Sequence, residues 1–334
     1  MRALPRKAVL LAQLIITALV LYFIGRTLVG QWVQFRATPL TAQPRWSEIV
    51  ASSLLVLLTY GVLVQTWRVM LGAYAERLSF RDAARIWSVS NLGRYVPGKI
   101  WQITAMGMMA QRSGVSPVAS TGSAILSTII NIACGIGIAL VLAWKWLASI
   151  HSAARTAGVA LVILAAAGLL ALPWVLPRVS SLAARMTGRP VDVQSPPPRS
   201  IAAAVVGNLL AWLFYGVAFM WLVGGVLGEA AGATWQYIAV FTASYVVGYL
   251  VLILPGGIGP REGVMMAMLT SFQLATPKQA LLVAGASRVW LTILELVPGI
   301  VFLAISRARR APPASQAPRA PTTTSDGSAF PPNQ

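Results

Sequence analysis

Few side chains in this sequence can carry acid–base, nucleophilic or metal chemistry. The 334 residues include one cysteine (Cys134), one histidine (His151) and eight acidic residues. One Cys and one His exclude a disulfide framework, a Cys/His zinc site and haem ligation by a His pair. Carboxylate catalysis would depend on Glu262 and Glu295, the two acids in strongly apolar surroundings. We therefore expect a protein that is not an enzyme and that has no metal and no cofactor.

Two short segments combine helix-breaking residues with cationic side chains. Proline lacks a backbone donor and disfavours helix in the residue before it, and glycine permits unusual dihedral angles, so both segments should interrupt a helix. The breaking residues are Pro97 and Gly98 in the first segment and Pro255, Gly256, Gly257 and Gly259 in the second. The cations are Arg94 and Lys99 beside the first break, Arg261 beside the second, and Arg288 in the last apolar run.

The charges near the second break have two interpretations. Ionisable groups within apolar spans are costly and usually face a bundle interior or a cavity. In one interpretation the acids only neutralise cations and hold the fold, Glu262 with Arg288 or Glu295 with Arg261. In the other, the cations bind an anionic group, because they outnumber the acids here. Glu262 and Glu295 would then balance the charge, or bind a cationic headgroup or a proton.

The elements that must position these residues are membrane helices. Hydrophobic residues make up 57% of the chain and charged residues 10%, whereas soluble chains carry about 25% charged residues. The net charge of +18 would suggest nucleic acid for a soluble protein. Here Arg and Lys lie mostly between apolar runs, where they set topology. The composition predicts an all-α, polytopic membrane helix bundle that does not bind nucleic acid.

Apolar runs near the roughly 20 residues that cross a bilayer predict seven spans, at about 8–24, 49–71, 118–147, 157–177, 201–227, 233–254 and 280–305. We expect the protein in the cytoplasmic (inner) membrane. Positive charge predicts that the N-terminus, the loops 76–99 and 178–200, and the tail face the cytoplasm. Seven crossings cannot leave both ends on one side. Either 100–112 or 260–275 crosses too, giving eight spans, or the tail assignment is wrong. Residues 1–306 form the membrane domain, and 307–334 a disordered Pro/Ala/Ser/Thr-rich tail.

The two broken segments form a weak internal repeat. Each is followed by a Met-rich stretch, a second proline and a full-length span. Roughly 12 helical residues rise only about 18 Å, which is too short for a core of about 30 Å. The segments are therefore re-entrant half-helices that face a polar cavity, or else interfacial elbows between ordinary spans.

At these segments the sequence resembles the transmembrane, flippase-like region of lysylphosphatidylglycerol synthases and their free-standing relatives. The matching residues are Asn91-Leu92-Gly93-Arg94-Tyr95-Val96-Pro97-Gly98-Lys99, Leu254-Pro255-Gly256-Gly257-Ile258-Gly259-Pro260-Arg261-Glu262-Gly263, and Arg288. The resemblance covers about residues 8–306 and implies a lipid-handling membrane domain. In bifunctional members that domain moves aminoacylated phosphatidylglycerol between leaflets. We expect a free-standing member without the synthase domain, because only a polar tail follows the last span.

Together these features predict a translocase, or a binding protein, for an anionic lipid. Its headgroup phosphate would contact Arg94, Lys99, Arg261 and Arg288. The alternative is a non-transporting accessory or scaffold subunit of a lipid- or polyprenyl-linked glycan pathway, with a glycosyltransferase or lipid-modifying enzyme as partner. A membrane-embedded transferase is a third interpretation, which the scarcity of acids and histidine disfavours.

Overall fold

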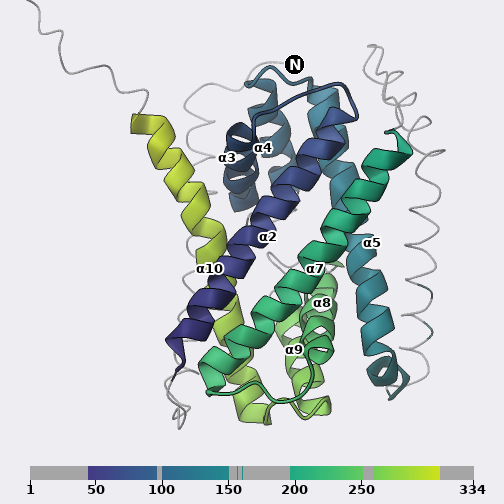
Figure 1. The fold of residues 1–334 in the computed structure, drawn as a ribbon, viewed down its shortest axis with the longest axis vertical. Coiled ribbons are helices and arrows are strands. Elements are labelled where there is room, and N and C mark those ends of the chain that lie inside the picture. Colours follow the sequence, from purple (N-terminus) through teal and green to yellow (C-terminus); the bar gives the residue numbers. More distant parts are fainter. Residues whose placement is uncertain are drawn as a thin grey trace, which may run out of the picture.

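The helices of the protein are seen in a computed structural model that describes residues 44–95, 100–149, 196–250 and 259–308, together with Thr156 and Ala160. Every regular element in these ranges is a helix, which confirms the all-α prediction (Figure 1). The elements are α2 (Trp46–Gly72), α3 (Phe80–Asn91), the 3₁₀ helix η1 (Leu92–Tyr95), α4 (Ile100–Gln111), α5 (Pro117–Ser149), α7 (Pro198–Leu227), α8 (Thr234–Leu250), α9 (Pro260–Ser271) and α10 (Pro277–Ala308).

Four of the described helices are long and apolar enough to cross a membrane. They are α2, α5 over Ala119–Trp144, α7, and α10 over Pro277–Ile305, and they confirm four of the predicted spans. The predicted span at 233–254 coincides with α8, which has only 17 described residues. The predicted spans at 8–24 and 157–177 lie outside the described residues apart from Ala160, so a total of seven to eight stays a prediction.

Helices α2 and α7 pack against each other in opposite directions. At one end the Arg45 amide donates to the Gly225 carbonyl over 2.9 Å. Further along, Ser52 Oγ donates to the Ala218 carbonyl over 2.5 Å. Small residues of α7 allow this close approach, as in many membrane helix pairs. The start of α2 therefore lies beside the end of α7.

Helices α3 and α4 form a short hairpin in one half of the bundle, the upper half in Figure 1. Its two ends lie together, because the Ser116 amide donates to Glu76 Oε1 over 2.9 Å. We expected a loop over 76–99, and that expectation is wrong for α3. The arginines of α3 made this region resemble a loop, but α3 is an amphipathic helix that buries Ala83 and Ile86 against the bundle.

Helices α8 and α9 form the corresponding hairpin in the other half. The rings of Trp235 and Phe272, near the two outer ends, have centroids 5.8 Å apart. The 17 and 12 residues of these helices rise about 26 and 18 Å. The chain thus enters and leaves this hairpin at the end of the molecule opposite the first hairpin (Figure 1).

The helix order makes the two halves inverted repeats. Within the described residues, each half has a long helix, two shorter helices and another long helix, α2–α5 and then α7–α10. Because α2 and α7 run in opposite directions, the hairpins enter from opposite ends. This arrangement confirms the pseudo-repeated halves predicted from the two broken segments, and it is common among secondary transporters.

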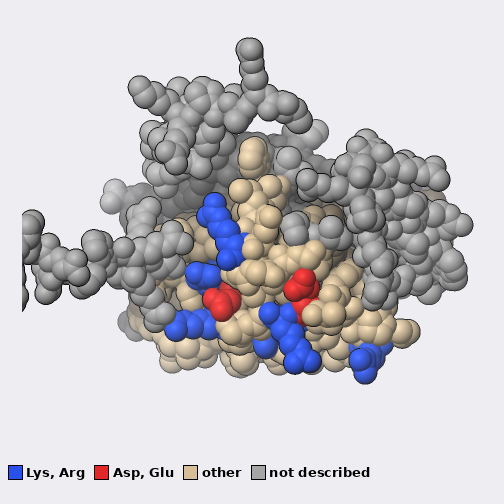
Figure 2. Space-filling view, turned by 90° about the horizontal axis from the view of Figure 1, so that it is seen from above, with Lys and Arg blue, Asp and Glu red and all other residues tan. Residues whose placement is uncertain are grey.

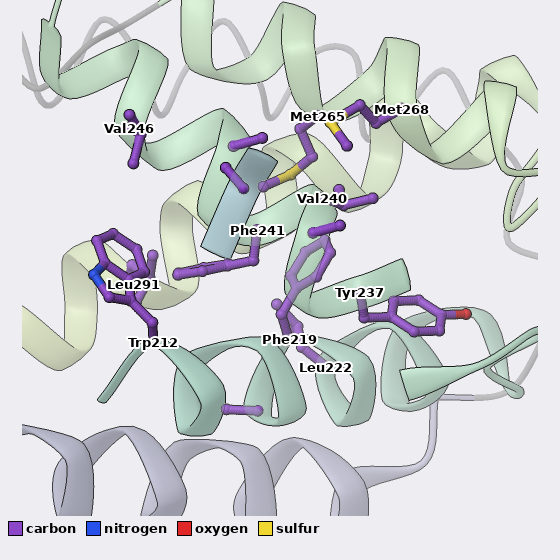
Figure 3. Packing of buried hydrophobic residues seen from close by; sticks show 14 of the residues in the cluster. Trp212, Phe219, Leu222, Tyr237, Val240, Phe241, Val246, Met265, Met268 and Leu291 are labelled. Carbon is purple, nitrogen blue, oxygen red and sulfur yellow. The ribbon is translucent and has the colours of Figure 1, made fainter. Parts of the chain in front are cut away.

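The main core lies where α7, α8 and α9 meet (Figure 3). Phe219, Tyr237, Phe241 and Met268 have no exposed surface there. Helix α8 is buried along most of its length by its neighbours on both sides. This packing holds one face of α8 against α9, the helix that follows the second broken segment in the sequence.

Charged residues differ between the two ends of the bundle. Figure 2 views the end that holds the outer ends of α3 and α4, where Lys and Arg outnumber Asp and Glu. Arg77, Arg81, Arg112 and Arg199 are exposed in this region. Glu229 and Lys278 lie near the opposite end. The described parts of the two loops that we expected on one side, which include Arg77 and Arg199, lie at this end.

Candidate functional site

The start of α9 is set by its first residues. Gly259 has φ of +96°, a conformation that L side chains rarely adopt. A Cβ there would meet no atom within 4 Å, so backbone conformation rather than space favours glycine. Pro260 follows as the first helical residue, where its missing N–H costs nothing. The predicted helix break at Gly259 is confirmed.

Glu262 joins this turn to α10. Its Oε2 accepts the Gly259 N–H over 2.7 Å, and its Oε1 lies 3.4 Å from Arg288 Nη1. The side chains of Arg288 and Glu262 are only 8% and 17% exposed. Both carboxylate oxygens are therefore engaged, and the predicted neutralisation of Arg288 by Glu262 is present.

Arg261 points instead toward α8. It is 6% exposed, and its guanidinium carbon lies 5.3 Å from the Tyr245 ring centroid and 5.8 Å from that of Phe241. Its Nη2 is buried, and none of the described residues accepts a hydrogen bond from it. An unsatisfied buried donor costs about 1–3 kcal/mol, and more when the group is charged. The arrangement holds a cationic donor ready for an acceptor that the described residues do not supply.

Glu295 completes the charge cluster. It is 9% exposed and lies two turns after Arg288 on α10. Arg288, Glu262 and Glu295 all lie within electrostatic range of the Arg261 guanidinium. Two arginines and two glutamates give this cluster no net charge when all four are ionised. An added anion would therefore enter a site with no net charge, in which Arg261 still has an N–H donor available.

A cavity of about 110 Å³ lies beside this cluster. Gln102 in the first turn of α4 and Tyr249 at the end of α8 are part of its wall, so helices from both hairpins line it. Tyr245 also lines it and separates it from Arg261. The lining residues are Leu63, Thr66, Trp67, Trp87, Gln102, Met106, Ala124, Ser127, Thr128, Asn131, Asn208, Trp212, Tyr215, Tyr245 and Tyr249.

Side-chain amides hold the cavity wall together. Asn131 Nδ2 donates to Asn208 Oδ1 over 2.7 Å, linking α5 to α7. Gln102 Nε2 donates to Asn91 Oδ1 over 2.5 Å, linking α4 to α3. Sequence reasoning missed these residues. Isolated amides in long apolar runs were the available signal, because polar groups within spans usually face a bundle interior.

The structure brings together four of the predicted site residues: Arg261, Glu262, Arg288 and Glu295. Arg94 belongs to η1, but the position of its side chain is not described. Six other predicted residues lie outside the described ranges: Pro97, Gly98, Lys99, Pro255, Gly256 and Gly257. Gly259 is described. Among the described residues, no three His, Cys, Asp or Glu side chains are grouped as metal ligands.

Comparison with known protein families finds a match over most of the chain. Residues 10–299 match the family model described as the lysylphosphatidylglycerol synthase TM region. The match covers all the described helices except the last residues of α10, and it confirms the resemblance seen in the two motifs. No curated protein matches the chain.

Proposed function

Because the chain belongs to the lysylphosphatidylglycerol synthase TM region family, we propose that this multi-pass membrane protein moves an anionic lipid between leaflets of the cytoplasmic membrane. The lipid phosphate binds Arg261, with Arg288 nearby, while the acyl chains stay in the bilayer. No covalent step is needed, and the protein acts without a cofactor. The N-terminus and the arginine-rich end face the cytoplasm.

The observation that carries this proposal is the buried, unsatisfied Nη2 of Arg261. Arg288 is already paired with Glu262, so Arg261 is the better first contact for a phosphate. Arg–phosphate hydrogen bonds are charge-assisted and among the stronger ones in proteins. In apolar surroundings such a contact offsets much of the desolvation cost of the phosphate.

The two hairpins supply a path for the headgroup. We propose that α3–α4 and α8–α9 are re-entrant, entering the bilayer from opposite sides and ending near its midplane. Non-helical backbone at that depth is tolerated only inside protein or against a water-filled cavity. Arg94 and Lys99, which border the first break in the sequence, would contact the phosphate at another stage of its passage.

A leaflet-exchange assay tests the proposal. Full-length protein is reconstituted with head-labelled anionic or zwitterionic phospholipid, and an impermeant reductant quenches label from outside. We expect quenching of the anionic lipid beyond the outer-leaflet fraction. Arg261→Gln should abolish this extra quenching, whereas Arg112→Gln, a matched change at an exposed arginine, should not.

Quenching that stops at the outer-leaflet fraction for every lipid would contradict translocation. It would favour the accessory role in a lipid- or polyprenyl-linked glycan pathway. Equal exchange in the Arg261→Gln protein would keep translocation but remove Arg261 from it.

A further inference from the structure

The cavity beside Tyr245 differs in chemistry from the arginine cluster. None of the described residues that line it is Asp, Glu, Lys, Arg or His. Its polar wall consists of amides, hydroxyls and aromatic rings. A charged group seated there would lack a counter-ion in the wall, which costs several kcal/mol in apolar surroundings.

The hydrogen bonds within the wall leave both acceptors and donors for a ligand, and Ser127 Oγ is buried with no partner among the described residues. The hydroxyl groups of Thr66 and Thr128 donate to backbone carbonyls of their own helices, each over 2.8 Å. Trp212 Nε1 donates to the Asn131 carbonyl over 2.9 Å. The amides of Asn131 and Gln102 each donate one N–H to another side chain. Their oxygens, Asn131 Oδ1 and Gln102 Oε1, accept no hydrogen bond from the described residues. A ligand whose groups both donate and accept hydrogen bonds, as hydroxyl groups do, would fit this wall.

Aromatic rings supply the rest of the cavity wall. Trp212 lies in edge contact with Tyr245, 5.5 Å between ring centroids, and 6.1 Å from Tyr215 (Figure 3 shows Trp212). Trp67 and Trp87 close other parts of the wall. Aromatic faces pack well against C–H groups. The wall thus offers ring faces for C–H groups and lone pairs for O–H groups.

These features select one ligand class. An acyl chain would leave the amide oxygens unsatisfied. An ammonium would gain about 2 kcal/mol from the rings, but no carboxylate lines the cavity to balance it. A neutral polyhydroxyl group satisfies the acceptors through its O–H groups and the rings through its C–H groups. The volume of about 110 Å³ corresponds to about four waters at roughly 30 Å³ each, which suits a small polyol or the hydroxyl groups along one edge of a sugar ring.

We propose that this cavity binds the uncharged polyhydroxyl part of a lipid headgroup, either a polyol or a glycosyl unit. This inference deepens the proposed function and rests on it for the phosphate contact. Tyr245 borders both places, so a phosphate at Arg261 and a polyol in the cavity can belong to one lipid.

Native mass spectrometry of the full-length protein in detergent tests the inference with four lipids. Phosphatidylinositol carries phosphate and polyol, phosphatidic acid carries phosphate alone, a monoglucosyl diacylglycerol carries a sugar alone, and phosphatidylethanolamine carries phosphate and ammonium. We expect phosphatidylinositol to bind about tenfold more tightly than phosphatidic acid or phosphatidylethanolamine. The glucosyl lipid should bind detectably without a phosphate.

Two variants assign this binding to the cavity. Ala124→Leu fills the space, and Thr128→Val removes a wall hydroxyl at nearly constant volume. Both should weaken binding of phosphatidylinositol and the glucosyl lipid about fivefold or more, and leave phosphatidic acid unchanged. Thr59→Val is the matched control, because Thr59 is buried, makes the same bond to its own helix over 2.7 Å, and does not line the cavity.

The outcomes separate the two proposals. Equal affinity for phosphatidylinositol and phosphatidic acid, or no effect of Ala124→Leu, would overturn the polyol site. Tighter binding of phosphatidylethanolamine than of phosphatidylinositol would overturn it in favour of an ammonium site. If Arg261→Gln leaves binding of phosphatidic acid unchanged while the cavity variants act as expected, the phosphate contact fails and the polyol site stands.

Discussion

Arg288 Nη1 lies 3.4 Å from Glu262 Oε1, and this buried pair joins the middle of α10 to the first turn of α9. Consecutive helical residues are about 100° apart around the axis. Pairing Glu262 with α10 therefore turns Arg261 toward Tyr245 and Phe241 of α8. The ion pair thus positions Arg261 as well as neutralising Arg288.

Glu262→Ala should destabilise the protein by about 3–5 kcal/mol, because it leaves Arg288 buried without its partner and removes the bond to the Gly259 N–H. Thermal unfolding of the detergent-solubilised protein measures this as a lower melting temperature. Glu262→Gln combined with Arg288→Met should recover much of the loss.

The exposed pair of Arg45 and Glu48 is the control for that measurement. Its side chains are 57% and 31% exposed, so Glu48→Gln should cost less than about 1 kcal/mol. Equal destabilisation by the Glu48 and Glu262 changes would contradict a structural role for the buried pair.

Gly216→Ala should separate α7 from α8. A Cβ at Gly216 would lie 2.5 Å from the backbone Cα of Ile238, a contact that only a helix shift relieves. We expect a loss of about 1–3 kcal/mol in unfolding free energy, as for other overpacked sites, seen as a lower melting temperature.

Gly137→Ala is the matched change in an open position. No atom lies within 4 Å of a Cβ there, and alanine favours helix over glycine by up to about 1 kcal/mol. The melting temperature should stay the same or rise. A Gly216→Ala protein as stable as the Gly137→Ala protein would contradict the close packing of α7 and α8.

Cysteine labelling tests the two hairpins. In a Cys134→Ala background, which removes the sole native thiol, single cysteines at Arg77 and Arg112 bracket the first hairpin. Cysteines at Glu229 and Lys278 bracket the second. If both hairpins are re-entrant, an impermeant maleimide should label the first two from one side of the membrane and the last two from the other. Labelling of Arg77→Cys and Arg112→Cys from opposite sides would mean that the first hairpin crosses.

The sequence was a good guide to the long helices and to the repeat. Runs such as 49–71 and 201–227 are apolar throughout, so their length alone predicts a span. It was a poor guide to α3, because Arg81 and Arg85 lower the local hydropathy although Ala83 and Ile86 are fully buried. A charged amphipathic helix has the composition of a loop when only its mean hydropathy is considered.

The candidate site was predictable only in part. Costly ionisable residues in apolar runs pointed to Arg261, Glu262, Arg288 and Glu295, which the structure brings together. Which acid pairs with which arginine depends on how α9 packs on α10, and sequence spacing left two pairings open. The cavity depends on residues such as Asn131 and Asn208 on different helices, 77 positions apart, whose contact only the tertiary fold creates.

Photocrosslinking tests the phosphate contact at Arg261 most directly. Full-length protein is reconstituted with phosphatidylglycerol that carries a diazirine in its headgroup, irradiated, and mapped by peptide mass spectrometry. We expect adducts on α8 and α9 near Tyr245 and Arg261, lost in Arg261→Gln and retained in Arg112→Gln. Adducts that persist unchanged in Arg261→Gln, or that occur only at lipid-facing residues such as Val141, which is 78% exposed, would contradict a buried phosphate site.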